Sequence, residues 1–424
     1  MSFTVLSSIL TEPSYQVALT SFLVIVLLSL RQVRSLLQER KVSSPSNERV
    51  YSIIGSIAVG NPRYRSTQEE ALETALKCPK LETVRPMLKR LYGNTRIANR
   101  YFCVPDFNPS DTRTGDDPMF YPSEGSYEVP IDVRLDKFTE EAVPLVTDVA
   151  RRAIKEAGIE VTEIDKLVVA SSTGLLSPGL DHELINNLGL MRSVDRTLVG
   201  FMGCAAAINS FRVANAYLEA NPGKNALVIC IELPSLHTTY DDSMNGAVMH
   251  AIFGDGCAAA VLQGVRERDC PKGAIAAVDN HAWLMEGTKE GITLTIKNNG
   301  ITSRLSKLLP KYIAKNLSSF VNHFLAKNNL RKSDLDFWCV HPGGPSIIQE
   351  AMNALGLSTE QLADSWAVLN DYGNMLSPSV MFVLERVLKR HRTALAQGKR
   401  GHNLGMAISF SPGVGVEAIL LKQI

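Results

Sequence analysis

The chain has 424 residues, of which 45% are hydrophobic and 21% charged, and its formal net charge is +1. These proportions are those of an ordinary globular protein that is long enough for one large domain or two fused ones. A net charge near zero gives no support for a nucleic-acid or other polyanionic partner. The seven cysteines are scattered, with no Cys-x-x-Cys pair and no metal-binding spacing with histidine. We therefore expect reduced thiols, no disulfide framework and no metal site.

Residues 1–50 differ in composition from the rest of the chain. The run 17–30 is nearly all apolar, and basic residues and a Ser-rich linker follow it. The run is shorter than the roughly 20 residues that a spanning helix needs. Its basic flank nevertheless favours a membrane anchor with the body of the protein in the cytosol. The alternatives are a helix packed on a soluble cytoplasmic body, or an extension that targets the protein to an organelle.

The first predicted elements of the body follow in chain order from residue 51. An alternating apolar pattern predicts a strand over residues 51–60, and a helical pattern covers residues 68–92. Residues 105–130 are rich in Pro, Asp, Ser and Gly and predict a long loop. A helix is expected over residues 139–158, and a strand over residues 165–172.

The next stretch contains a candidate nucleophile, Cys204. Residues 196–202 predict a buried strand, and residues 205–220 predict a helix that stops at Asn221-Pro-Gly. Cys204 therefore lies at a strand-to-helix turn, where free N–H groups and the helix dipole favour an anion. We expect a lowered thiol pKa and a nucleophilic thiolate. The competing interpretation is a buried cysteine that acts as a small hydrophobe.

The pattern of the chain then repeats. After strands predicted at 225–232 and 257–263, the segment 329–341 has the same helix end, polar turn, Asp and strand as the segment 158–170. Each half then has a candidate functional residue before or at a helix. These residues are Cys204, 34 positions after residue 170, and Asn374, 33 positions after residue 341. A helix at 377–397 and strands at 405–410 and 416–422 complete the pattern. We expect an α/β fold of two similar halves, 51–271 and 272–424, with mixed sheets layered between helices.

Three residues of this repeat form a coherent active site. If the halves pack with pseudo-twofold symmetry, Cys204 and Asn374 occupy related places and His341 ends the strand that faces them. The imidazole would hold Cys204 as a thiolate, and His341 and Asn374 would donate to an enolate or thioester oxygen. These motifs contain no acidic base, which suits a carbanion made by decarboxylation. Taken singly, His341 has the alternative of a core histidine, and Asn374 that of a turn residue or helix cap.

From about residue 51 to the C-terminus, the chain resembles the type III polyketide synthases, the chalcone synthase-like branch of the thiolase superfamily. The resemblance is carried by Gly203-Cys204, Ile252-Phe-Gly-Asp-Gly-Cys-Ala-Ala-Ala, Trp338-Cys-Val-His341-Pro-Gly-Gly-Pro and Tyr372-Gly-Asn374-Met. It implies a thiolase-like αβαβα fold and a Cys204 that is acylated by a starter acyl-CoA. It also implies that malonyl-CoA is decarboxylated beside His341 and Asn374, that the enolate condenses with the acyl group, and that repeated extension ends in cyclisation. Such enzymes are homodimers that use free CoA esters without a metal, another cofactor or a carrier domain.

Several positions depart from the plant members of this family. The Gly-Phe-Gly-Pro-Gly loop is Ser409-Phe-Ser-Pro412-Gly413 here, and Pro412 and Gly413 would keep the loop shape. Leu376 stands where plant enzymes have a small polar residue, and Leu294 stands where a phenylalanine gates the plant cavity. Leu376 would alter the cavity wall, and the exchange of a flat aromatic residue for Leu294 favours an aliphatic, long starter. Of the basic residues that hold CoA in plant enzymes, only Arg90 has a clear counterpart, because Met87 and Asn94 replace lysines.

Three other functions compete with this interpretation. A membrane-bound 3-ketoacyl-CoA synthase has a Cys/His/Asn site and hydrophobic N-terminal segments. A β-ketoacyl carrier-protein synthase III usually has Ala or Gln where this chain has Pro342, and requires an acidic carrier. A non-catalytic scaffold of the thiolase fold would not need the intact Cys204, His341 and Asn374.

Overall fold

A computed structural model describes residues 48–78, 80–107, 129–238 and 242–424. The chain divides into two compact units, Met1–Arg49 and Val50–Ile424, and every helix and strand named in this subsection belongs to the second. The apolar run 17–30 lies outside the described residues. Within the described ranges, no helix is long and apolar enough to cross a membrane.

Nine strands of the described residues form one mixed sheet in the order β11-β12-β13-β8-β1-β7-β6-β4-β5. Their bounds are β1 Val50–Gly60, β4 Ile164–Ser171, β5 Asp195–Gly200, β6 Asn225–Glu232, β7 Gly256–Arg266, β8 Ile275–Leu284, β11 Phe337–Val340, β12 Leu404–Ser411 and β13 Gly415–Gln423. β1 and β8 share only the pairs Ser52–Ala277 and Ile53–Ala276. The sheet therefore consists of two parts, one from each half of the chain, joined at this short seam.

The two parts repeat the same local structure. β4 runs parallel to β6, which pairs antiparallel with β7. In the second half, β11 runs parallel to β12, which pairs antiparallel with β13. A short 3-10 turn precedes β4, at Val161–Glu163, and β11, at Lys332–Asp334. In each turn the last residue's carboxylate accepts from a backbone N–H three residues earlier, Glu163 from Glu160 and Asp334 from Arg331. This repetition confirms the two similar halves predicted from the sequence.

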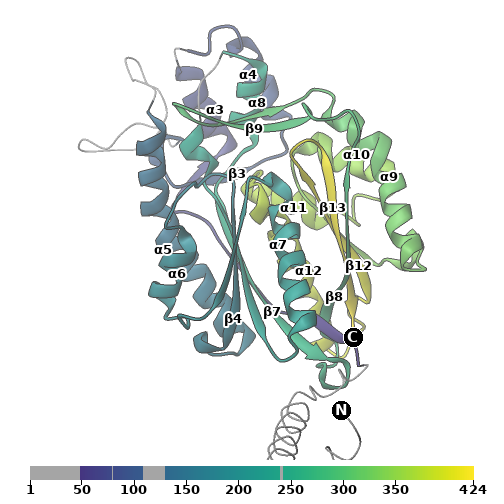
Figure 1. The fold of residues 1–424 in the computed structure, drawn as a ribbon. Helices are drawn as coiled ribbons and strands as arrows, with labels where there is room; N and C mark the ends of the chain where they lie inside the picture. Colours follow the sequence, from purple (N-terminus) through teal and green to yellow (C-terminus); the bar gives the residue numbers. More distant parts are fainter. Residues whose placement is uncertain (1–47, 79, 108–128, 239–241) are drawn as a thin grey trace, which may run out of the picture. The chain divides into compact units, whose positions relative to one another are not determined.

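Helices lie between the two parts of the sheet and on their outer faces. α7 (Ala206–Ala220) and α12 (Ser377–Ala396) contact each other and strands of both parts, and they form the middle layer (Figure 1). α5 (Ile131–Ala157) and α6 (Leu180–Leu188) cover the first part. α9 (Leu309–Lys327) and α10 (Pro345–Leu355) pack together beside the second (Figure 1). Helices, sheet, helices, sheet and helices are the αβαβα layers that we expected.

The remaining elements surround the ends of the strands. They are α3 (Gln68–Lys77), α4 (Arg85–Gly93), α8 (Met244–Ile252), α11 (Ala363–Tyr372), the hairpin of β2 (Tyr64–Thr67) and β3 (Asn99–Phe102), and the hairpin of β9 (Ile292–Lys297) and β10 (Gly300–Leu305). In Figure 1, α3, α4, α8 and β9 gather at the top of the view. These elements build the surroundings of the candidate active site.

Three predicted elements differ from the structure. The helix expected over 68–92 is two helices, because Cys78 is extended before Pro79, as proline requires of its predecessor. The helix expected from 139 begins at Ile131. The strand expected to be buried before Cys204 is β5, whose residues are exposed or half-exposed, because it lies at the sheet edge and pairs only with β4 among the described strands. Of the loop expected at 105–130, residues 108–128 lie outside the described ranges.

Candidate active site

Cys204 lies in a tight turn that both halves of the chain hold. A 3-10 turn spans Gly203–Ala205, and α7 begins at Ala206. The Gly203 N–H donates to Ser172 Oγ, just after β4, at 3.0 Å. The Cys204 carbonyl accepts a 2.7 Å hydrogen bond from Ser409 Oγ on β12. The position of the thiol is therefore fixed by one strand end from each half.

His341 comes directly after the last residue of β11 and is 1% exposed. Its N–H donates to the Ile408 carbonyl at 2.9 Å. Because Ile408 immediately precedes Ser409, adjacent residues of β12 hold His341 and Cys204. Neither ring nitrogen of His341 has a hydrogen-bond partner among the described residues. A buried imidazole without partners is unusual, and it indicates a ring that meets a ligand.

Asn374 lies between α11 and α12 and is held through its backbone and its side chain. Its N–H donates to the Ile252 carbonyl at 2.8 Å, and its own carbonyl accepts from the Gly254 N–H at 3.0 Å. Its Nδ2 donates to the carbonyl of Gly343, two residues after His341, at 3.2 Å. Its side chain also hydrogen-bonds the Cys204 thiol. The structure thus places Asn374 at Cys204 and on the turn that follows His341, and the catalytic role of the three residues stays a prediction.

The protonation states differ from the expected thiolate. Burial raises the pKa of the Cys204 thiol to about 12, nearby Glu232 contributes to this rise, and the Asn374 hydrogen bond opposes it. Burial lowers the pKa of His341 to about 3. The resting pair is therefore a thiol beside a neutral imidazole. The expected effect of the helix dipole is outweighed by desolvation, since the enclosed site is a poor environment for a lone charge.

Glu232, the last residue of β6, is a fully buried carboxyl in this site that the sequence analysis missed. It accepts from the Ser172 N–H at 3.0 Å, the Thr173 hydroxyl at 2.6 Å and the Ser377 hydroxyl at 3.1 Å. Burial raises its pKa to about 7 against these hydrogen bonds. The only sequence signal was that the glutamate ends an apolar strand, which does not reveal the partners that hold it in the fold.

A hollow of about 700 Å³, a volume that includes the solvent at its open side, reaches as far as Leu376, two residues after Asn374. Both Leu294 and Leu376 line it, and their part in substrate binding stays a prediction. Its other apolar walls come from β3, α8 and the β9–β10 hairpin, and include Phe102, Phe107, Met249, Phe253 and Ile301. Leu294 also reaches the nucleophile turn, since a Cβ on Gly203 would lie 3.7 Å from Leu294 Cδ1.

His237 lies in the wall of this hollow. Its Nε2 donates to the Thr173 carbonyl at 2.6 Å, and its Nδ1 accepts from the Ile301 N–H at 3.2 Å. Burial lowers the pKa of His237 to about 4, so the ring is neutral. It ties the β9–β10 hairpin to the end of β4 and fixes that side of the wall.

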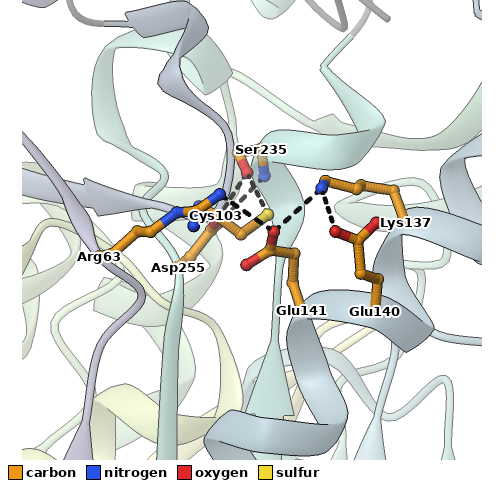
Figure 2. Close-up of polar contacts among 7 residues, drawn as sticks. All are labelled: Arg63, Cys103, Lys137, Glu140, Glu141, Ser235 and Asp255. Carbon is orange, nitrogen blue, oxygen red and sulfur yellow. Dashed lines mark hydrogen bonds and ion pairs between the residues drawn. The ribbon is translucent and has the colours of Figure 1, made fainter. Parts of the chain in front are cut away.

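A buried carboxyl from the Gly-Asp-Gly motif supports another side of the wall (Figure 2). Asp255 accepts from the Cys103 N–H at 2.8 Å, the Ser235 N–H at 3.0 Å and the Ser235 hydroxyl at 2.5 Å. Burial raises the pKa of Asp255 to about 6. Nearby, Glu141 on α5 pairs with Lys137, at 3.0 Å. Asp255 therefore joins the chain after β3 to the start of β7 and to the segment that carries Ser235.

Pro412 lies directly against the turn that carries Cys204, and Gly413 follows it. A Cβ on Gly203 would approach Pro412 Cδ to 3.2 Å. Gly413 has φ 74°, and its N–H donates to the Ile292 carbonyl at 2.9 Å. The next residue, Val414, has φ 51°, an unfavourable value for a β-branched side chain. Phe201 and Leu376 share this left-handed conformation, so strained residues lie close in sequence to Cys204 and Asn374.

Arg90 lies apart from the other predicted site residues. It is exposed on the last turn of α4 and is not among the residues that line the hollow. α4 packs against α8, which does line the hollow. Among the described residues, no group of three or more His, Cys, Asp or Glu side chains is placed to hold a metal ion.

Comparison with known proteins gives a consistent result. Residues 41–265 match the N-terminal domain of chalcone and stilbene synthases, and residues 277–424 match the C-terminal domain. A Mycobacterium tuberculosis protein named Alpha-pyrone synthesis polyketide synthase-like Pks18 is 37% identical over 90% of this chain and 93% of its own. Polyketide synthase 37 of Dictyostelium discoideum is 36% identical over 80% of this chain, which corresponds to 11% of that larger protein.

Solved structures agree with these matches. The crystal structure of PKS-I from the brown alga Ectocarpus siliculosus superposes with a TM-score of 0.86 and is 68% identical, covering 89% of this chain and 100% of that one. The C-terminal type III polyketide synthase domain of Steely1 from Dictyostelium has a TM-score of 0.76 over 88% of this chain and 99% of its own. At 24% identity, the second match supports the fold alone.

Proposed function

Because the chain belongs to the chalcone and stilbene synthase family, the type III polyketide synthases, we propose that it extends an acyl-CoA starter with malonyl-CoA by iterative decarboxylative condensation. The observation that carries the proposal is the buried His341 ring, which has no partner for either nitrogen among the described residues and lies with Asn374 at the Cys204 thiol. Two neutral donors beside a nucleophile suit a thioester oxygen that gains negative charge.

The first step loads the starter onto Cys204. Proton transfer from the thiol to His341 forms a thiolate, and the adjacent imidazolium offsets the penalty of burying that charge. The thiolate attacks the carbonyl carbon of the starter acyl-CoA. The C–S bond to CoA breaks, and the CoA thiolate takes the proton from His341. The acyl group is then a thioester of Cys204, and His341 is neutral again.

The second step makes the carbon nucleophile. With the thioester oxygen of malonyl-CoA facing His341 and Asn374, the C–C bond to the carboxylate breaks and CO2 leaves. The electron pair remains on the α-carbon and the thioester oxygen as an enolate. Hydrogen bonds from the two side chains strengthen as this oxygen becomes negative, which lowers the barrier.

The third step forms the new bond. The enolate carbon attacks the acyl carbonyl of the Cys204 thioester, a C–C bond forms, and the Cys204 thiolate leaves. The 3-ketoacyl-CoA product reloads onto Cys204 for another round. After the last extension, the poly-β-keto chain closes to a pyrone, a resorcinol or a phloroglucinol ring.

The starter that we propose is aliphatic. Leu294 and Leu376 contribute branched aliphatic surface to the hollow, and its other large lining residues are mostly apolar. Burial of a methylene against such a wall is worth about 0.8 kcal/mol, so each added carbon that finds contact favours a longer chain. Arg90, on the exposed face of α4, is the residue that we propose to meet the CoA phosphates at the mouth.

We also propose a homodimer in which two copies meet along β5. Among the described strands, β5 pairs on one side only, and an unpaired strand edge is a template for pairing with another chain. Exposed apolar side chains flank it: Leu198 on β5 is 55% exposed, Leu175 is 53% exposed and Met191 is 50% exposed. Replacement of Leu198 by Lys should halve the mass measured by light scattering, whereas the same change at exposed Leu308 should not.

Membrane association through residues 17–30 remains a proposal from the sequence alone. Flotation of the full chain with anionic vesicles, compared with a chain lacking residues 1–47, tests it directly. Equal flotation of both chains would contradict an anchor in that run.

One product analysis tests the proposed function. Purified enzyme is incubated with labelled malonyl-CoA and with starters from hexanoyl- to palmitoyl-CoA, with coumaroyl-CoA as the aromatic comparison. Pyrones, resorcinols or phloroglucinols from aliphatic starters are expected. A single 3-ketoacyl-CoA product would instead identify an elongase. A preference for coumaroyl-CoA would contradict the aliphatic starter. If no CO2 were released from malonyl-CoA, the protein would be a non-catalytic scaffold.

A further inference from the structure

We propose that Leu376 is a positioning residue whose backbone N–H, together with the Gly343 carbonyl, sets the orientation of the Asn374 carboxamide. The inference rests on the proposed role of Asn374 in decarboxylation. The backbone N–H of Leu376 would thus support the decarboxylation step, whereas its side chain only lines the cavity.

The two contacts of the carboxamide leave only one orientation. The Leu376 N–H, 2.9 Å away, is a donor, so the atom that it meets must be the carboxamide oxygen, Oδ1. The Gly343 carbonyl, at 3.2 Å from the other end, is an acceptor, so the atom that it meets must be Nδ2. A rotated carboxamide would lose both hydrogen bonds and would place like groups together.

The consequence is a directed N–H at the reaction centre. One hydrogen of Asn374 Nδ2 is used by Gly343, and the same side chain hydrogen-bonds the Cys204 sulfur. Once Cys204 is acylated, that second hydrogen is free for the thioester oxygen of malonyl-CoA. With the opposite orientation, Oδ1 would face a developing negative charge and would repel it.

Leu376 can donate in this way because its backbone is strained. Its φ is 54° and its ψ is −127°, which a leucine adopts only when its surroundings impose it. The surroundings are present: the Met375 N–H donates to Ser379 Oγ at 2.8 Å, the Ser379 N–H donates to the Leu376 carbonyl at 3.1 Å, and the Ser377 hydroxyl donates to Glu232. The side chain itself is 5% exposed in the wall of the hollow.

Gly343 holds the other end of the carboxamide two residues after His341. A Cβ at Gly343 would lie 3.3 Å from His341 Nε2, tighter than an ordinary contact. Glycine at this position therefore leaves room for the His341 ring beside the carbonyl that holds Asn374. The Leu376 side chain would contact the proposed acyl chain, and the Leu376 N–H holds the Asn374 carboxamide. Residues 374–376 would thus connect the starter pocket to the decarboxylation site.

The test replaces the Leu376 amide by an ester. Incorporation of the α-hydroxy analogue of leucine at position 376 removes the N–H and keeps the side chain. We expect malonyl-CoA decarboxylation to fall about tenfold or more, the equivalent of one net hydrogen bond. The rate at which a starter acyl-CoA acylates Cys204, measured by intact mass, should stay within about twofold of the wild-type rate.

An ester at Ser379 is the matched control. It also removes one hydrogen bond of this segment, from the Ser379 N–H to the Leu376 carbonyl, but it changes no group that contacts Asn374. A merely structural role would make the two esters equivalent. Equal decarboxylation rates in the two ester variants would overturn the inference.

Asn374→Ala separates this inference from the proposed function. In the Leu376 ester background, Asn374→Ala should cause no further loss of decarboxylation beyond that of Asn374→Ala alone. If the loss in the double variant equalled the product of the two single losses, the two groups would act independently. That result would also overturn the inference. If Asn374→Ala alone leaves decarboxylation intact, the role proposed for Asn374 in catalysis is what fails.

Discussion

Replacement of Glu232 by Gln should remove a pH-dependent loss of stability. Burial raises the pKa of Glu232 from 4.5 to about 7. A carboxyl whose pKa is higher in the folded state contributes stability that is complete below the unfolded pKa and is lost as the pH rises through the folded pKa. With about 1.36 kcal/mol per pKa unit, the wild-type chain should lose about 3 kcal/mol from this group between pH 4.5 and pH 8.

Urea unfolding followed by tryptophan fluorescence at a series of pH values measures this loss. The Glu232→Gln chain has no titrating group at this position. Its free energy of unfolding should therefore fall by about 2–3 kcal/mol less than that of the wild-type chain over the same pH range. Asp255→Asn is the matched control, because burial raises the pKa of Asp255 only to about 6 and its contribution is lost at lower pH. The same pH dependence in wild type and Glu232→Gln would refute the assignment of a buried, neutral carboxyl.

The remaining predictions concern the nucleophile and the wall. His341→Ala should slow alkylation of the half-buried Cys204 by iodoacetamide at about pH 8 at least about tenfold, because the thiol loses its proton acceptor; an unchanged rate would mean that another group activates it. Leu376→Gly should be more stable to urea than Leu376→Ala by about 1–2 kcal/mol, because only Gly accepts the positive φ without strain, and the opposite order would argue against that strain. Leu294→Phe should lower kcat/KM for palmitoyl-CoA relative to hexanoyl-CoA, and an unchanged ratio would remove Leu294 from the chain-length wall.

The amino-acid pattern alone carries enough information to predict which segments of the two halves lie at equivalent places. The similarity of the segments 158–170 and 329–341 predicts two equivalent strands, which are β4 and β11. Equivalent strands bring the residues after them to related positions, and the structure indeed gathers Cys204, His341 and Asn374. Periodicity therefore predicts the layers and the site together, because both depend on the same repeated unit.

Other features depend on the surroundings of a residue rather than on its type. The position of Cys204 at a helix start predicts a lowered pKa, but burial and the nearby Glu232 raise it, and neither can be seen without the packed structure. The positive φ of Leu376 and Val414 could not be predicted from the sequence either, because no local pattern indicates positive φ for Leu or Val. The sequence shows residue 232 only as the end of a strand, and the fold alone places it beside residues from separate segments.

The most direct test of the account is the site of acyl transfer. Enzyme is incubated with a starter acyl-CoA in the absence of malonyl-CoA, digested, and mapped by mass spectrometry. The account predicts one acyl group, on the peptide that contains Cys204, and predicts that Cys204→Ala makes no condensation product while some release of CO2 from malonyl-CoA persists. An acyl group on another residue, or full-length product from Cys204→Ala, would contradict it.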